Sequence, residues 1–407
     1  MQGEIQMLNE KAIDSLIQPV IQRQENINIF VLTSIADKIG EIGTLSPSDI
    51  KKLKLLVQMG TDIRLLDKEL ARLCDLQIHD TKRIIRDVAI DANLDAKPLY
   101  DYRHKPFIPY EQNSKLQQYV KAVSERTSGT FVNLAKSKAT GFLIRDLKNP
   151  SNLKFQSIND TYKSVVDEAI QSVRSGVDYR VAMRHTLKQL ANSGIRRMVW
   201  DSGYTQRLDT TVRRNLLEGI RAINQLIEDE NGRKLKADGK ELSAHINCAL
   251  DHEPFQGHMF TNEEFDRLQN NESFADINGE AFTAVDRVIG EYNCRHVAYS
   301  VILGVSKPRY TLEQLQAMID KNHKGYTLPN GKHKTLYECT QIQRQLETKI
   351  RYAKEEQMMM KAAGNLEDAK RARKRVVKYT IELQKFSKAC GLKLSKDRYS
   401  ISGYRAI

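Results

Sequence analysis

The chain has 407 residues, of which 40% are hydrophobic and 28% charged, and its formal net charge is +13. This composition is ordinary for a globular protein of roughly two to four domains. The longest apolar stretch, residues 298–305, is too short to cross a bilayer, and the acidic start has no apolar run of the secretory kind. We therefore expect neither membrane association nor a secretory signal. Five widely scattered cysteines do not make a disulfide framework, so we expect folding in a reducing cytoplasm.

The positive charge is concentrated in two segments. Residues 1–95 carry about −3, residues 96–200 about +10, residues 201–333 about −4 and residues 334–407 about +10. A cationic surface attracts nucleic acid through phosphate contacts, although solvated helix faces also often carry excess Lys and Arg. Charge density alone leaves open whether the last segment binds nucleic acid or an acidic protein surface, or is only a solvated face.

Residues 1–97 are predicted to be a helical region. The stretch at 46–73, SPSDIKKLKLLVQMGTDIRLLDKELARL, has apolar residues at three- and four-residue steps and no pattern typical of catalysis. Residues 98–112, PLYDYRHKPFIPYEQ, contain three prolines and four aromatic residues. We interpret them as an extended linker that docks its aromatic rings on a neighbouring element.

This linker opens a second predicted region, residues 98–200. The stretches 114–144 and 160–194 have amphipathic helical patterns, and Gly194 suits a C-terminal helix cap.

The third predicted region, residues 201–333, starts with another helix and then changes character near residue 241. ELSAHIN at 241–247 and HVAYSVIL at 296–303 resemble strands, with Pro, Gly, Asn and Asp clustered between them. The run Pro329-Asn330-Gly331 predicts a turn. We expect a small α+β domain here, and it carries six of the nine histidines.

Residues 334–407 are predicted to be a basic antiparallel helical hairpin, which makes the whole chain mainly α with one small α+β domain. Gly364 and Asn365 supply the stop and start signals between its helices, and apolar residues at three-four spacing form a seam along each helix. The run KRARKR lies on the expected outer face. We predict phosphate or acidic-partner contacts for five of its residues: Lys370, Arg371, Arg373, Lys374 and Arg375.

The histidines and cysteines of the third region are candidates for a metal site. If residues 294–296 are extended, the side chains of Cys294 and His296 point to the same side, and His245 and His252 approach from the other stretch. These four residues suit tetrahedral zinc, so zinc is left open as a cofactor. The spacing is unspecific, because there is no CxxC pair. The alternative is a buried cysteine beside histidines that bond backbone groups.

A catalytic site is the weaker interpretation of the same residues. A Cys–His nucleophile needs the imidazole within hydrogen-bond reach of the thiol and a third group to orient the imidazole. A cysteine and a histidine two positions apart on a strand are not a known catalytic signature. The chain has no GxSxG, Walker, GxGxxG or HExxH motif. We therefore assign no catalytic residue.

The order of several short motifs resembles a known family. SAH at 243–245, His252, FQG at 255–257 and NCRH at 293–296, followed by GVSKP, are similar to the MuF-like head-morphogenesis proteins of tailed bacteriophages. The likeness is closer to the phage minor capsid protein 2 family, and the stretch 201–219 and the basic ending are also similar to it. The motif residues, besides the candidate ligands, are Ser243, Gln256, Gly257, Asn293 and Arg295. The chain departs from the family pattern at Phe255, where Trp is frequent, and at Tyr204, where Arg is frequent.

The resemblance implies a non-enzymatic minor structural protein of the phage head. It implies association with the portal protein and other capsid proteins during procapsid assembly, and contact with packaged double-stranded DNA, without sequence specificity, or a role in DNA delivery. The protein would be made in the host cytoplasm and end in the virion, and residues 201–333 would be the MuF-like domain.

Two alternatives remain. A metal-dependent hydrolase or transferase predicts stoichiometric zinc and a pocket that opens around His252 and Cys294. A stand-alone nucleic-acid-binding helical protein predicts tight DNA binding by the free chain and no capsid partner.

Overall fold

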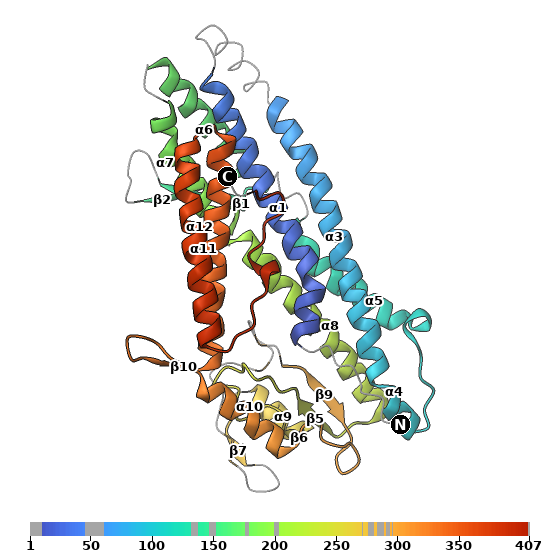
Figure 1. The fold of residues 1–407 in the computed structure, drawn as a ribbon. Coiled ribbons are helices and arrows are strands. Elements are labelled where there is room, and N and C mark those ends of the chain that lie inside the picture. The colour runs from blue at the N-terminus through green and yellow to red at the C-terminus, as the bar shows by residue number, and fades with distance from the viewer. Residues whose placement is uncertain are drawn as a thin grey trace.

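The structure is a computed structural model, and it describes residues 10–44, 61–131, 137–145, 152–175, 179–198, 203–270, 272–275, 281–282, 289, 294 and 296–405. Within these residues the chain is mainly helical with small antiparallel sheets, as predicted (Figure 1). No helix in this part of the chain is both long enough and apolar enough to span a membrane.

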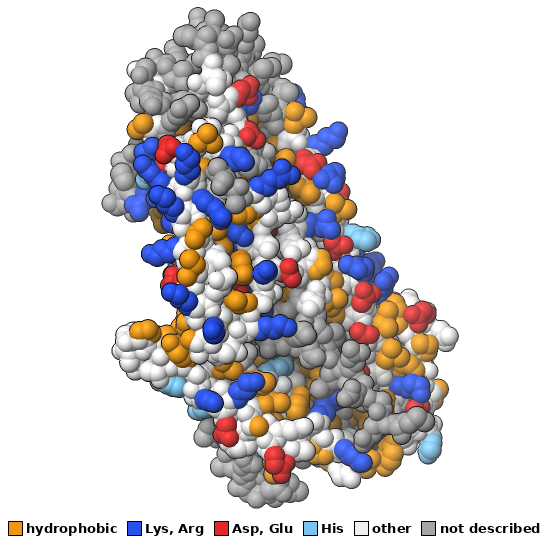
Figure 2. Space-filling view, in the orientation of Figure 1, with side chains coloured by type: hydrophobic (Ala, Val, Ile, Leu, Met, Phe, Trp, Pro, Cys, Tyr) orange, Lys and Arg blue, Asp and Glu red, His pale blue; other side chains and the backbone are white. Residues whose placement is uncertain are grey.

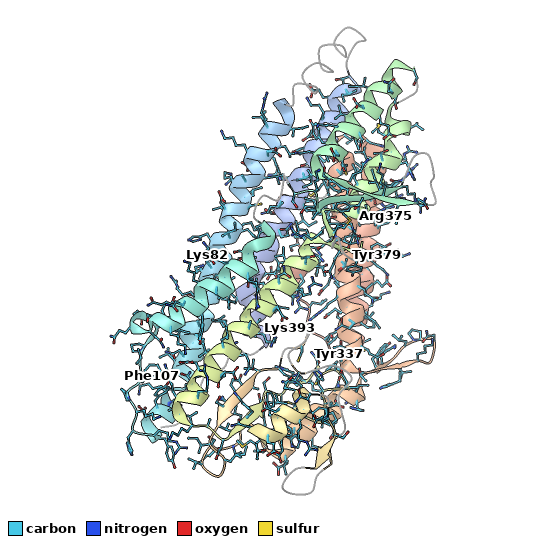
Figure 3. The ribbon with its side chains drawn as sticks, turned by 180° about the vertical axis from the view of Figure 1, so that it is seen from behind. Lys82, Phe107, Tyr337, Arg375, Tyr379 and Lys393 are labelled. Atoms are coloured by element: carbon cyan, nitrogen blue, oxygen red, sulfur yellow. The ribbon has the colours of Figure 1, made fainter. Side chains whose placement is uncertain are left out.

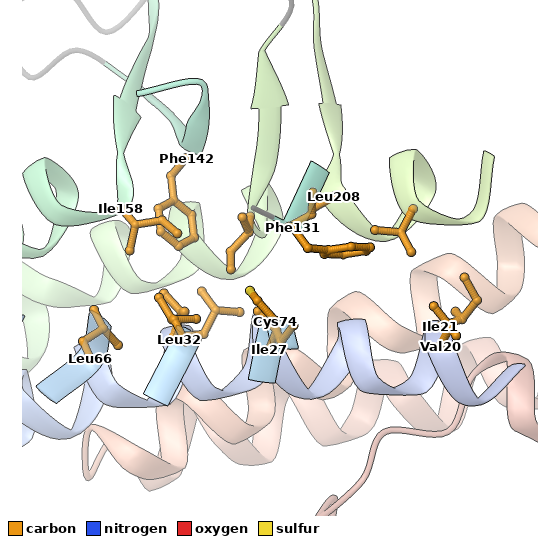
Figure 4. Packing of buried hydrophobic residues seen from close by; sticks show 14 of the residues in the cluster. Val20, Ile21, Ile27, Leu32, Leu66, Cys74, Phe131, Phe142, Ile158 and Leu208 are labelled. Atoms are coloured by element: carbon orange, nitrogen blue, oxygen red, sulfur yellow. The ribbon is translucent and has the colours of Figure 1, made fainter. Parts of the chain in front are cut away.

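Long helices and one sheet form what we call the body, residues 10–235. Its helices are α1 (Glu10–Ile42), α3 (Thr61–Asp95), α5 (Ser114–Ser128), α6 (Ile158–Arg174), α7 (Tyr179–Ser193) and α8 (Leu208–Leu235). Apolar side chains at helical spacing face one large cluster, which includes Leu32 of α1, Leu66 of α3 and Leu208 of α8 (Figure 4). As predicted, α7 ends at Gly194, which has φ +57°.

The sheet of the body was not predicted. β1 (Thr140–Arg145), β2 (Leu153–Ser157), β3 (Arg196–Met198) and β4 (Thr205–Arg207) pair antiparallel in the order β2-β1-β3-β4. Helix was wrongly predicted for residues 140–144, where Phe142 is fully buried near Ile158 (Figure 4). A Cβ on Gly141 would lie 1.8 Å from the carbonyl oxygen of Gln156 across the pair. Packing against a partner strand, which local periodicity does not reveal, decides the conformation here.

The predicted linker is only partly extended. Residues Lys97–Tyr102 form the short helix α4, in which Pro98 occupies the first turn and therefore costs no hydrogen bond. The predicted docking is confirmed for one ring: buried Tyr100 belongs to one cluster with Leu235 of α8, and its hydroxyl donates to Asn231 Oδ1 at 3.0 Å. Within the linker the Phe107 ring (Figure 3) meets Tyr100 edge-on with ring centroids 5.7 Å apart, whereas Tyr102 is 52% exposed.

Residues 239–334 form what we call the small unit, at the lower end of the molecule in Figure 1. Its central sheet has the order β6-β5-β9. Its elements are β5 (Gly239–Leu242), β6 (Met259–Thr261), α9 (Asn262–Gln269), β7 (Phe274–Ala275), β8 (Ala281–Phe282), β9 (Ala298–Val301), α10 (Leu312–Lys324), β10 (Tyr326–Thr327) and β11 (His333–Lys334). The strands at 241–247 and 296–303 are shorter than predicted, and the residues between Leu242 and β6 are irregular.

The small unit has a core of its own. Phe255, Phe260 and Leu242 are each at most 1% exposed and belong to one cluster. Phe255 therefore anchors its loop in this core. The predicted turn at 329–331 joins β10 to β11, and Gly331 has φ +80°.

The C-terminal helices form the predicted antiparallel arrangement, which we call the hairpin: α11 (Leu336–Ala362) and α12 (Leu366–Ala389). Gly364 has φ +73°, and the Asn365 side chain accepts from the amide of Asp368, so the stop and start signals are confirmed. Met359, Met360, Ala363 and Ala369, which surround the turn, join the large cluster of the body. The turn end of the hairpin is thus part of the core of the body.

The division into 1–97, 98–200, 201–333 and 334–407 stays a prediction. The cluster of the body draws on three of these four segments and on the turn of the hairpin, and α8 packs against α3 and α5.

Candidate metal centre

Two loops carry the histidines and cysteines, and they leave the sheet side by side. Leu242, the last residue of β5, pairs with Ala298, the first residue of β9. The amide of Ser243 donates to the Val297 carbonyl at 3.0 Å, and the Val297 amide donates to the Ser243 hydroxyl at 3.1 Å. The buried Ser243 therefore ties the two loops together at their base.

Gln256 and Gly257 close the first loop. Buried Gln256 accepts the amide of His245 at 2.8 Å through its Oε1. Gly257 has φ +75°, and a Cβ at this position would lie 2.3 Å from Leu315 Cδ2. The backbone conformation and the close approach of Leu315 both favour glycine.

His252, Cys294 and His296, three of the four predicted ligands, come together. Cys294 Sγ lies 3.6 Å from His252 Nδ1 and 3.4 Å from His296 Nδ1. One ligand atom from each residue lies within 4.8 Å of the other two. Both histidines are buried and Cys294 is half-buried. Imidazole nitrogens and a thiolate are ligands that Zn²⁺ accepts, so this group has the chemistry to hold such an ion.

His245 lies beside this group. Its Nε2 is 3.3 Å from Ser243 Oγ, and its ring centroid is 5.0 Å from that of His296. Among the described residues, the ligand atoms that lie within 4.8 Å of one another belong to His252, Cys294 and His296, and His245 is not in this group.

Cys248 was not predicted to take part, yet it contacts the group. Its Sγ lies 3.6 Å from His296 Nε2, the ring nitrogen opposite the one that faces Cys294. Cys248 precedes His252 by four residues in CALDH, and this short spacing is the feature of the sequence that could have indicated its place near the group. On the other histidine, Asp251 Oδ2 lies 3.7 Å from His252 Nε2. Each buried histidine therefore directs Nδ1 to Cys294 and its second nitrogen to another side chain.

Burial determines the charge of His296. It lowers the pKa of His296 well below the ordinary value, and the neighbouring His245 and His252 lower it further. His296 is therefore neutral at pH 7, the form in which imidazole binds metals.

A cavity of about 580 Å³ lies beside the group, between the small unit, α8 and α11. His252, Cys294 and His296 all contribute to its wall, and Tyr337 lines it from the start of α11 (Figure 3). Its other charged side chains are Arg213, Arg214, Arg344, Arg351, Arg398, Asp209, Glu218 and Glu347. The arginines outnumber the carboxylates, so the cavity favours anionic or neutral contents.

Two of the predicted motif residues, Asn293 and Arg295, lie outside the described residues.

The five predicted phosphate-contact residues lie on the first half of α12. Lys370, Arg371 and Lys374 are exposed, whereas Arg373 and Arg375 are half-buried. Three of them form ion pairs within the hairpin: Lys370 with Glu367, Arg371 with Asp368 and Arg375 with Glu356. The exposed basic side chains of α12 continue beyond this run, at Lys378, Lys385 and Lys388.

Comparison with known proteins gives one match that covers most of the chain. The model of the family described as phage minor capsid protein 2 matches residues 8–388. No curated protein and no solved structure matches the chain.

Proposed function

The chain belongs to the phage minor capsid protein 2 family, and from this premise we propose that it is associated with the portal vertex during procapsid assembly and contacts packaged DNA. Members of the family are structural proteins of the phage head, so this chain is a minor structural component of the virion that associates with other capsid proteins. The family match across residues 8–388 is the observation that carries the proposal, because it includes the body, the small unit and the hairpin.

An exposed cationic stripe on α12 supports the contact with an acidic partner. Residues at three-four spacing lie on one face of a helix. Five exposed basic residues follow this spacing on α12, and we call them the α12 stripe: Arg371, Lys374, Lys378, Lys385 and Lys388. Lys and Arg side chains extend along the hairpin in Figure 2. Binding by such a stripe is independent of nucleotide sequence and weakens as salt rises.

The same stripe supports an order of events in assembly. Before packaging, it faces an acidic surface of the portal or of another head protein. After packaging, DNA phosphates provide a denser negative charge and replace that surface.

Quantitative mass spectrometry of gradient-purified particles tests the proposal, with this chain counted against the portal subunit. We expect a low, fixed copy number together with cross-links to the portal subunit. A copy number that scales with the major capsid protein, or absence from mature particles, would contradict association with the vertex.

The metal-dependent enzyme is the second candidate, and the cavity beside His252 and Cys294 favours it. We still propose a non-enzymatic role. The reason is the family match, because the family is one of structural proteins of the phage head. Particles carrying Cys294→Ser separate the two candidates. An enzyme predicts a normal copy number with a defect after assembly, and a structural role predicts reduced incorporation.

A further inference from the structure

We propose that His252, Cys294 and His296 bind one Zn²⁺ ion through Nδ1, Sγ and Nδ1, with the fourth coordination position facing the cavity. The ion would join the loop after β5 to the segment before β9, and the proposal does not depend on the role of the protein in the head.

The interatomic distances carry the assignment. Tetrahedral zinc with Zn–S of about 2.3 Å and Zn–N of about 2.05 Å places a sulfur and a nitrogen ligand about 3.6 Å apart. Cys294 Sγ lies 3.6 Å from one Nδ1 and 3.4 Å from the other. The remaining edge joins the two histidines, and one ring nitrogen of His252 lies within 4.8 Å of one ring nitrogen of His296. Binding requires only that this edge shorten to about 3.3 Å.

The orientation of the rings is a second, independent observation. Metal-bound histidines direct their other ring nitrogen to a second group that fixes the ring. His296 directs Nε2 to Cys248 Sγ at 3.6 Å. The carboxylate of Asp251 lies 3.7 Å from His252 Nε2, an electrostatic contact longer than a hydrogen bond. Because Cys248 lies across the His296 ring from Cys294, the geometry assigns it a positioning role and not a ligand role.

A bound metal also accounts for both short contacts of the Cys294 sulfur, which a single S–H hydrogen bond does not. The S–H of Cys294 has one proton and donates to only one of the two Nδ1 atoms near it. A thiolate bound to zinc faces both nitrogens at once without a proton. Three protein ligands and one position open to a cavity is a recurrent arrangement for zinc, and a cavity of about 580 Å³ has room for a water molecule in that position.

The first test uses the full chain without a histidine tag, purified in the absence of chelators. Elemental analysis should find about one zinc per chain. Cobalt substitution should give an intense thiolate-to-cobalt band in the near ultraviolet and strong visible bands of a four-coordinate ion. A wild-type chain that is folded but binds neither zinc nor cobalt would overturn the proposal, since the short distances would then be hydrogen bonds alone.

Substitutions assign the ligands. Cys294→Ser should lose the charge-transfer band, and His296→Ala should lose stoichiometric metal. Cys390→Ser is the control, because Cys390 is another free cysteine, buried at the end of α12. It should keep both signals, and loss of both would show that these signals report folding and not ligation.

Cys248→Ser tests the positioning role. We expect the cobalt spectrum to remain and the zinc affinity to fall about 10- to 100-fold, as for other groups that orient a metal-bound histidine. Complete loss of the charge-transfer band in Cys248→Ser, with the band kept in Cys294→Ser, would overturn the ligand assignment.

Discussion

Arg207 and Glu355, 148 residues apart in the chain, form a two-point ion pair inside the protein, with the same Arg207 nitrogen 2.7 and 3.0 Å from the two carboxylate oxygens. Arg207 is 5% exposed, Glu355 is fully buried, and the guanidinium lies 4.0 Å above the centre of the Tyr352 ring. Glu355 also accepts from Asn28 of α1 at 2.9 Å. One contact thus joins β4, α11 and α1.

A second arginine extends this contact into a network. Arg351 of α11 binds Asp209 at 2.8 Å and also Glu25 of α1. Burial raises the pKa of Glu355 to about 7, although Arg207 opposes this shift. The network holds three carboxylates against two guanidinium groups, so it tolerates removal of a carboxylate charge better than removal of an arginine.

The first prediction concerns Arg207→Met, which leaves Glu355 buried without its cation and Asp209 with Arg351 as its remaining arginine. Breaking a buried pair costs about 3–5 kcal/mol, so the free energy of unfolding in urea should fall by that amount. Arg233→Met is the matched control. Arg233 lies on α8, the helix that begins directly after Arg207, but it is 68% exposed in a pair with Glu230, and its loss should cost at most about 1 kcal/mol. Equal costs for the two variants would refute a stabilising role for the buried network.

The second prediction concerns Glu228, which joins α8 to β9. Its carboxylate accepts the amide of Ser300 at 2.8 Å, and burial raises its pKa to about 7. The pKa of Glu228 is thus about 7 in the folded protein and 4.5 in the unfolded protein. Because the folded protein binds the proton more tightly between these pH values, its stability falls as pH rises from about 4.5 to 7.

Glu228→Gln removes this titration and leaves the other ionisable groups in place. Between pH 5 and 8 the variant should gain roughly 2 to 3 kcal/mol of unfolding free energy relative to the wild type. Denaturant unfolding of both proteins at the two pH values measures the difference. Parallel pH profiles would show that Glu228 ionises normally in the folded protein.

The third prediction concerns DNA binding by the α12 stripe. Replacing its five basic residues by Gln should reduce the slope of log affinity against log salt by up to about 4.5, because each lost phosphate contact removes about 0.9. The measurement is fluorescence anisotropy with a random-sequence duplex across a salt series.

The matched control for the stripe removes the same charge from α3. Five of its exposed basic residues are replaced: Arg64, Lys68, Arg72, Lys82 and Arg83. Their replacement by Gln should leave the slope nearly unchanged. Equal slopes for the two variants would mean that net charge, not the stripe, governs DNA binding.

The fourth prediction compares two glycines with similar backbone conformation. Gly257 and Gly331 have φ +75° and +80°, but a Cβ meets Leu315 at the first position and no atom within 4 Å at the second. Gly331→Ala should cost about 1 kcal/mol from backbone strain alone. Gly257→Ala should cost about 1–3 kcal/mol more, because the added methyl group overlaps Leu315. If thermal unfolding gives the same loss for both, the overlap is relieved by movement of Leu315.

Local signals predicted the hairpin well and the sheet of the body poorly. The apolar seam, Gly364 and Asn365 all act within one or two helical turns, so the sequence alone reveals them. The strand at Thr140 depends on a partner at Leu153–Ser157 and another at Arg196, and no local period reports such pairings.

The candidate metal centre was predicted in part for the same reason. Residue type was enough to select His252, Cys294 and His296. Only the fold shows that His245 turns to Ser243 and that Cys248 lies behind His296. The Arg207–Glu355 pair was not predicted, because nothing in the sequence around either residue indicates its partner.

The burial of the hairpin turn in the body limits how this protein can be divided. Met359 and Met360 are at most 1% exposed, and a Cβ on Gly40 of α1 would lie 3.2 Å from the carbonyl oxygen of Ala362. A fragment that ends before α11 would expose this part of α1 to water and lose both arginine–carboxylate contacts to Glu355 and Arg351. The hairpin therefore cannot be exchanged between related phage-head proteins unless the surface of α1 that contacts it is redesigned as well.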